Sequence, residues 1–276
     1  MFFCPTLHHS DVFYSRQLAS YNYCVYDGAT GNADMIFWSE VVARRGVDEV
    51  CSAILKSLNG IQRLAPGQQR SMTFWSDRCV GQVNNWTFVC MMMYLIQEGF
   101  YTTVEQKFLC SGHSFLACDS AFALIEKRKG KCNVNTPQDW IPLIQSARPS
   151  QPFNVIQMTQ ADVKEWTNEF LCLPKPPSLL VTCVAAIRMD RNNLSQILTR
   201  SDHSPMNVWN CHFLAAPLET GRYDRRRRVI FQDLNFNPAT KYSSPIELSD
   251  EKKRDLRKLM DYLPPHERAF YQPHLI

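Results

Sequence analysis

The sequence lacks the features by which several protein classes are recognised. Glycine is scarce, with ten in 276 residues, and no repeating period is present, which excludes fibrous and solenoid architectures. No G-x-G-x-x-G, phosphate-binding P-loop or G-x-S-x-G motif occurs, so the usual marks of dinucleotide, nucleotide and serine-hydrolase sites are missing. A small-molecule α/β enzyme therefore has no support from motifs.

Signals for secretion and membrane insertion are also missing. Residues 1–5 show no charged and apolar leader pattern, and the longest apolar run, Phe88 to Ile96, is too short to cross a bilayer. The eleven cysteines are odd in number, irregularly spaced and without a C-x-x-C pair, which argues against a disulfide framework. We therefore expect a nuclear or cytoplasmic protein with free thiols and no membrane partner.

The composition is that of a folded protein with a weak charge bias. Hydrophobic residues make up 45% of the chain and aromatic residues 12%, enough to build a sizeable core. Lysine and arginine number 30 against 26 aspartates and glutamates, a net charge of +4. Such a small excess neither requires nor excludes a nucleic-acid partner, so the choice of partner depends on motifs.

Periodicity predicts seven elements in the first 130 residues. Alternating or β-branched segments predict strands over 20–27, 33–40, 71–76 and 101–109. Apolar residues at helical spacing predict helices over 47–58, 84–97 and 114–129. Strands mixed with helices in this order indicate one mixed sheet with helices on its faces.

The second half of the chain has a different pattern. Helices are expected over 136–147, 159–171 and 249–261, and strands within 154–158 and 179–231. We place a domain boundary near residue 150. Residues 1–150 are expected to form the α/β core, and residues 151–276 an α+β C-terminal extension packed on it.

Acidic residues occupy positions where a sheet can bring them together. Asp27 ends the first strand, Asp77 follows the strand of 71–76, and Asp119 lies on the helix after the last strand, with Glu126 two turns further on. Carboxylates that meet at one sheet edge repel unless they share a cation, and Mg²⁺ and Mn²⁺ prefer such oxygen ligands. The alternative is that each acid is a solvated cap.

One segment carries a family resemblance. Residues 74–85 read F-W-S-D-R-C-V-G-Q-V-N-N, which resembles the signature F/Y-Y/W-S-D-x-C-x-G-Q-x-x-N of a large, mostly uncharacterised family of animal transposon-derived proteins. The match continues through the K-F-L of 107–109, the G-H-S-F of 112–115, Asp119 and the I-E of 125–126. Further similar motifs lie between Phe13 and Tyr271, so the resemblance covers nearly the whole chain.

That family looks like transposases with an RNase H-like core of the retroviral-integrase superfamily. The resemblance implies an RNase H-like mixed sheet flanked by helices, and a metal-dependent polynucleotidyl transferase or nuclease acting on DNA phosphodiesters. Two Mg²⁺ or Mn²⁺ ions, and no small-molecule cofactor, would be bound by Asp27, Asp77 and Asp119. These three acids would be catalytic. Glu126 competes for the third place, but we expect Asp119 because it lies nearer the positive end of its helix.

Two departures from the family pattern leave a second function open. Family members commonly have Asn-Lys-Asn after the Gly-Gln, where this chain has Val83-Asn84-Asn85 and so lacks a lysine that would meet a phosphate. The sequence also begins at the core, without the DNA-targeting region that usually precedes it. The alternative is a catalytically inactive, domesticated transposase that binds nucleic acid or protein, as a monomer or an oligomer.

Six residues are candidates for contacts with nucleic acid: Gln82, Asn85, His113, Lys127, Arg128 and Lys129. An amide side chain can hold a phosphate or a base edge, and a basic cluster can follow a phosphate backbone. Each also has a structural alternative: a cap in a turn for the amides, a hydrogen bond within the turn for the histidine, and a favourable cationic helix end for the basic cluster. The arginine run at 225–228 is a candidate nuclear-localisation signal.

Overall fold

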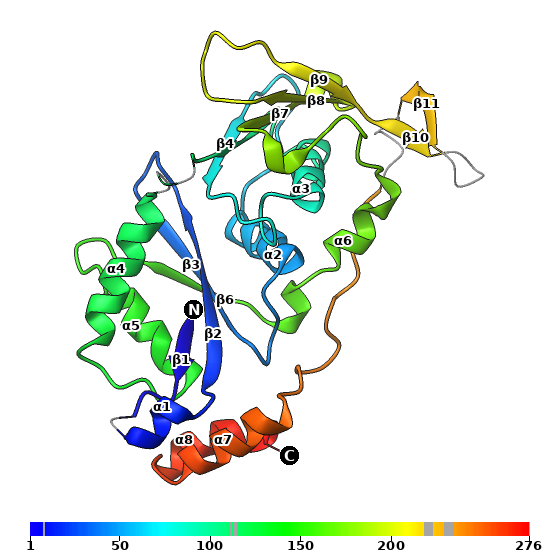
Figure 1. Cartoon of the computed structure of the whole chain (residues 1–276). Helices are drawn as coiled ribbons and strands as arrows, with labels where there is room; N and C mark the ends of the chain where they lie inside the picture. The colour runs from blue at the N-terminus through cyan, green and yellow to red at the C-terminus, as the bar shows by residue number, and fades with distance from the viewer. Residues whose placement is uncertain (8, 111, 113–114, 218–222, 229–234, 276) are drawn as a thin grey trace.

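The chain folds around two main β-sheets. The computed structural model describes residues 1–7, 9–110, 112, 115–217, 223–228 and 235–275. The first sheet has the strand order β1-β2-β3-β6, the second has the order β4-β5-β7-β8-β9, and β10 and β11 form a separate pair (Figure 1). The predicted mixed α/β fold with flanking helices is confirmed.

The first sheet is built on a hairpin. Strand β2 (Leu18–Tyr26) runs antiparallel to β3 (Ala33–Ser39), and the turn between them contains Gly31 at φ +72°, a conformation that favours glycine. Strand β1 (Phe2–Cys4) extends the sheet beside β2. Strand β6 (Asn154–Gln157) pairs in parallel with the other edge of β3.

The second sheet also combines distant parts of the chain. Strands β4 (Ser71–Ser76) and β5 (Thr103–Phe108) are parallel, and α3 (Trp86–Gln97) connects them. Three antiparallel strands follow on the far side of β5: β7 (Ala186–Asp190), β8 (Gln196–Arg200) and β9 (Asn210–Phe213). The small pair consists of β10 (Ala215–Pro217) and β11 (Tyr223–Arg228).

Helices pack on both faces of the first sheet. Helices α2 (Val47–Ser57) and α3 lie between the two sheets, where their apolar side chains form one core with β5, β7 and α6 (Trp166–Glu169) (Figure 1). On the other face are α4 (Ala117–Lys129), α5 (Trp140–Ser146), α7 (Asp250–Met260) and α8 (Pro265–Tyr271). A short helix α1 (Ser10–Tyr14) precedes β2. No helix in these ranges is long and apolar enough to cross a membrane.

The structure corrects two expectations. The single sheet predicted for the first 130 residues is divided, because β2 and β3 belong to one sheet and β4 and β5 to another. The helix predicted over 159–171 is broken into 3-10 turns at Gln160–Asp162 and Phe170–Cys172 with α6 between them. The helix is interrupted because Lys164 forms a β-bridge with Thr240, and a β-bridge requires extended backbone.

Strands after residue 150 complete both main sheets. Strand β6 pairs with β3, and β7 pairs with β5, so residues on either side of the expected boundary share sheets. The predicted C-terminal helix is present as α7, where Ser249 caps the first turn by accepting a hydrogen bond from the backbone N–H of Lys252. The site described next lies between the first sheet and the end of β4.

Candidate functional site

A cavity of about 460 Å³ lies where β2, the end of β4 and helix α4 meet, and three predicted acids line it. Asp77 enters from the end of β4, and Asp119 and Glu126 enter from α4. Strand β2 contributes Tyr21, Asn22, Tyr23 and Cys24, and Arg45, Trp75 and Gln82 also line the space. The structure therefore brings together three of the four acids selected from the sequence.

Asp77 is fixed by the turn that follows β4. One carboxylate oxygen, Oδ1, accepts a hydrogen bond from the backbone N–H of Cys79 at 3.1 Å, and the side chain is exposed. The hydroxyl of Ser76 donates to the backbone carbonyl of Asp77 at 2.8 Å. This local network orients the carboxylate and leaves Oδ2 without a partner among the described residues.

Helix α4 carries the other two acids on one face. Asp119 lies in its first turn, where Oδ2 accepts a hydrogen bond from the backbone N–H of Leu116 at 2.7 Å and so secures the start of the helix. Glu126 is exposed and has neither a hydrogen bond nor an ion pair from its side chain within the described ranges. Ala121 and Ile125, on the opposite side, are buried against the first sheet and hold the helix in place.

Asp27, the predicted first acid, is not among the residues that line this cavity. It lies in the turn between β2 and β3, where Thr30 Oγ1 donates to Oδ2 at 2.7 Å and the Ala29 N–H donates to Oδ1 at 2.9 Å. The hydrogen bond from Thr30 lowers the pKa of Asp27 below its usual 3.8. Asp27 and Asp77 follow strands of different sheets, and the shared Asp27–Asp77–Asp119 centre stays a prediction.

The cavity's acids suit a metal ion only in part. Within the described ranges, no group of three or more histidine, cysteine, aspartate or glutamate side chains is placed to hold a metal. Yet Asp77, Asp119 and Glu126 each retain a carboxylate oxygen without a described partner. Mg²⁺ usually binds through one or two carboxylates, several waters and substrate phosphates. The donors therefore fit an ion that arrives with a phosphate rather than a preformed three-acid site.

The residues expected to contact nucleic acid have different surroundings. Asn85 caps α3: its Oδ1 accepts from the Phe88 N–H at 3.0 Å, and its Nδ2 donates to the Val80 carbonyl at 2.8 Å. Gln82 lines the cavity, and with its side-chain amide turned so that the oxygen faces Arg45, that oxygen accepts from Arg45 Nε at 2.8 Å and from its Nη2 at 3.1 Å. Asn85 is thus committed to the helix start.

The remaining candidates are the basic cluster and the histidine. Lys127, Arg128 and Lys129 form the last turn of α4, and none of them makes an ion pair in the described part of the chain. They are therefore available to a polyanion, and they also complement the negative end of the helix. His113 and the next residue, Ser114, lie outside the described residues.

Two cavity residues were missed by sequence reasoning. Arg45 supplies the guanidinium beside Gln82, and Trp75 stands at the rim with 49% of its surface exposed. Lys107 Nζ lies 5.2 Å from the Trp75 ring centroid, and the His203 ring lies 5.7 Å from it. The register of β4 and β5 places Trp75 opposite Lys107, and the sequence alone does not give that register.

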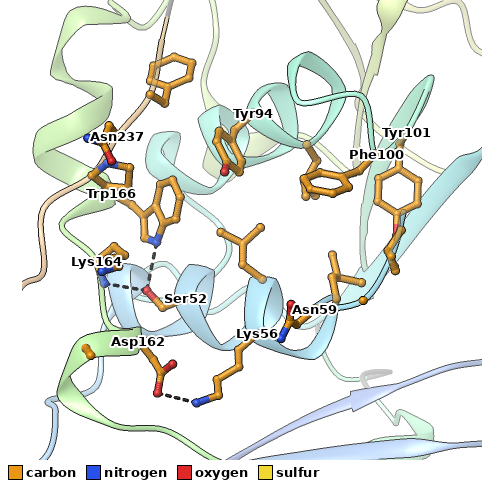
Figure 2. Close-up of a pocket in the computed structure, with 18 residues that line it drawn as sticks. Ser52, Lys56, Asn59, Tyr94, Phe100, Tyr101, Asp162, Lys164, Trp166 and Asn237 are labelled. Carbon is orange, nitrogen blue, oxygen red and sulfur yellow. Dashed lines mark hydrogen bonds and ion pairs between the residues drawn. The ribbon is translucent and has the colours of Figure 1, made fainter. Parts of the chain in front are cut away.

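A second cavity, of about 540 Å³, lies on another face of α2 (Figure 2). Its walls include Tyr94, Phe100, Tyr101 and Trp166, and Ser52 lies on the α2 side. Lys56 and Asp162 form an ion pair at 2.5 Å near its edge (Figure 2). None of the residues predicted from the sequence to be catalytic or to bind nucleic acid lines this cavity. Its aromatic walls suit an apolar or aromatic group.

Comparison with known proteins gives a family but no activity. A family model described as a domain of unknown function, DUF7869, matches residues 30–193, which is more than half of the chain. The chain belongs to the DUF7869 family. The DUF7869 region contains Asp77, Asp119 and Glu126 and begins after Asp27. No curated protein and no solved structure shows significant similarity to the chain.

Proposed function

We propose that the chain is a transposase-like protein that cleaves or transfers nucleic-acid phosphodiesters at the cavity between β2, β4 and α4, with a divalent cation. The observation that supports the proposal is the convergence of Asp77, Asp119 and Glu126 on one cavity. Three carboxylates against the guanidinium of Arg45 and the amino group of Met1 leave an excess of negative charge, which a divalent cation would offset.

Each lining residue has a role in this proposal. Asp77 and Asp119 would bind the ion, which supplies an activated water or hydroxyl nucleophile and stabilises the leaving oxygen. Arg45, held by Gln82, would contact a phosphate oxygen. Trp75 at the rim would stack on a base. Lys107, whose Nζ lies beside the Trp75 ring and 3.5 Å from Glu105 Oε1, would pair with the backbone. The substrate is therefore a strand whose bases are accessible.

The test is cleavage of labelled single-stranded and duplex DNA in Mg²⁺ or Mn²⁺ by the purified chain and three variants. We expect Asp77→Asn and Asp119→Asn to abolish cleavage, and Glu126→Gln to reduce it less. Asp27→Asn is the matched control and should retain activity, because Asp27 lies outside the cavity. Circular dichroism checks that each variant is folded.

Two outcomes would contradict the proposal. If Asp27→Asn lost as much activity as Asp77→Asn, Asp27 would be a catalytic residue and the cavity would not be the active site. Absence of any metal-dependent cleavage by the unmodified chain would remove the catalytic function altogether.

The second candidate function is a catalytically inactive module that binds nucleic acid. The specific observation in its favour is the position of Asp27 in the hairpin turn, outside the set of residues that line the cavity. In this case the unmodified chain would shift labelled DNA in a binding assay, and neither Mg²⁺ nor Mn²⁺ would lead to cleavage. Binding that weakens steeply as salt rises would show that phosphates are the main contacts.

A further inference from the structure

Two cysteines from distant parts of the chain meet in the acid-lined cavity. Cys24 lies on β2, and Cys118 lies in the first turn of α4. The Cys118 thiol donates to the backbone carbonyl oxygen of Cys24 at 3.6 Å, so its sulfur reaches the strand at Cys24. Both residues line the cavity. The pair is thus held together by the packing of α4 against the first sheet.

Access distinguishes this pair from the buried thiols of the core. Cys24 and Cys118 are half-buried and border a cavity, so a small solute can reach them. Cys51 and Cys90, in contrast, are fully buried in the core between the sheets. All eleven cysteines are free thiols in the structure. Oxidation of the folded protein should therefore select the pair over the core thiols.

We propose that Cys24 and Cys118 are a redox-modification site that forms a reversible disulfide when a peroxide enters the cavity. In the first step, one sulfur attacks a peroxide oxygen; the O–O bond breaks, an S–O bond forms, and water or an alcohol leaves. In the second step, the other sulfur attacks the sulfenic acid; the S–S bond forms, the S–O bond breaks, and water leaves. Two thiols lose two electrons in total, and the peroxide gains them. A small dithiol or glutathione reverses the reaction by exchange.

The bond would join two elements that carry the candidate site. Asp119 follows Cys118 directly, and Tyr23 precedes Cys24 on the strand that lines the same cavity. A Cys24–Cys118 bond would therefore fix the start of α4 to β2. An effect of this restraint on catalysis rests on the proposed function, whereas formation of the bond does not.

The test uses the full chain carrying Cys110→Ser, treated with a small excess of hydrogen peroxide under native conditions. Trypsin releases Cys24 within residues 17–44 and Cys118 within residues 108–127, and the Cys110→Ser change leaves one thiol in each peptide. After alkylation of remaining thiols, mass spectrometry without reduction should show these two peptides joined. Dithiothreitol should separate them.

Two further variants keep the test sharp. In Cys24→Ser, the sulfenic acid on Cys118 should accumulate as a dimedone adduct, because the second thiol is missing. In Cys118→Ser, the adduct should form on Cys24. Far-ultraviolet circular dichroism confirms the fold of each. Oxidation of Cys132 and Cys211, which are exposed, without any 17–44 to 108–127 product would overturn the proposal. So would a joined product that forms only after the protein is unfolded.

Discussion

The indole nitrogen of Trp166 donates a hydrogen bond to Ser52 Oγ at 3.0 Å, and this contact joins α6 to α2 across 114 residues of sequence (Figure 2). The same hydroxyl oxygen accepts from the backbone N–H of Lys164 at 3.0 Å. Ser52 is buried, so both donors depend on it. This one side chain fixes the segment that forms a wall of the second cavity.

Ser52→Ala should therefore destabilise the fold. The substitution leaves the buried Trp166 N–H without its acceptor, which costs about 1–3 kcal/mol of unfolding free energy. Urea unfolding followed by circular dichroism measures the change. Ser71→Ala, at an exposed position on β4, is the control and should lie close to the unmodified protein. Equal stability of the two variants would show that the hydroxyl is dispensable.

Lys241→Met should destabilise the protein more strongly. Lys241 Nζ lies 2.8 Å from Oε1 of Glu49, which is fully buried, and 3.1 Å from Oδ2 of Asp48. Removing the ammonium leaves the buried Glu49 carboxylate with the Tyr242 hydroxyl as its one remaining donor among the described residues, at a cost of about 3 kcal/mol. Thermal and urea unfolding would show it. Lys258→Met on the exposed face of α7 is the matched control, and a similar loss there would contradict the explanation.

Asp27→Ala should lower stability in a pH-dependent way. Hydrogen bonds from Thr30 and Ala29 favour the carboxylate, so the pKa of Asp27 in the folded protein lies below the usual 3.8. Its stabilising effect is present above pH 3.8 and is lost as the pH falls through the lowered value. The difference in melting temperature between the unmodified protein and the variant should thus be larger at pH 7 than near pH 3. A gap that widens in acid would reverse the assignment.

Trp75→Ala should weaken binding of single-stranded DNA. The exposed ring has Lys107 over its face, and stacking of one base on such a ring contributes about 1–3 kcal/mol. We expect roughly tenfold weaker binding by fluorescence anisotropy, with Trp75→Phe close to the unmodified chain. Phe13→Ala removes another exposed aromatic ring, which lies outside the cavity, and serves as control. Equal losses in both alanine variants would point to nonspecific effects.

Local elements were predictable from the sequence because their signals are local. The strand predicted over 71–76 is β4, and the helix predicted over 47–58 is α2 to within one residue. The helix predicted over 114–129 begins at Ala117 and ends where expected. In each case periodicity and a turn or cap residue lie within the segment itself.

Long-range pairing was not predictable in the same way. Strand β7 pairs with β5 across about eighty residues, and nothing in either strand specifies its partner. The same limit applies to the site. Asp77 and Asp119 were found from motifs, but Asp27 was placed with them on the assumption of one sheet, whereas Asp27 follows a strand of the first sheet and Asp77 a strand of the second. Arg45 enters the cavity through tertiary packing that the sequence does not display.

The interleaved strand order also has a consequence for synthesis. When the ribosome has made 150 residues, β3 still lacks β6 on one edge, and β5 still lacks β7 on one edge. Unpaired edges of this kind can pair with the edges of other chains. The nascent chain therefore carries two open edges until β6 and then β7 leave the exit tunnel. A pause in translation within this interval would lengthen the time during which chaperones must shield both edges.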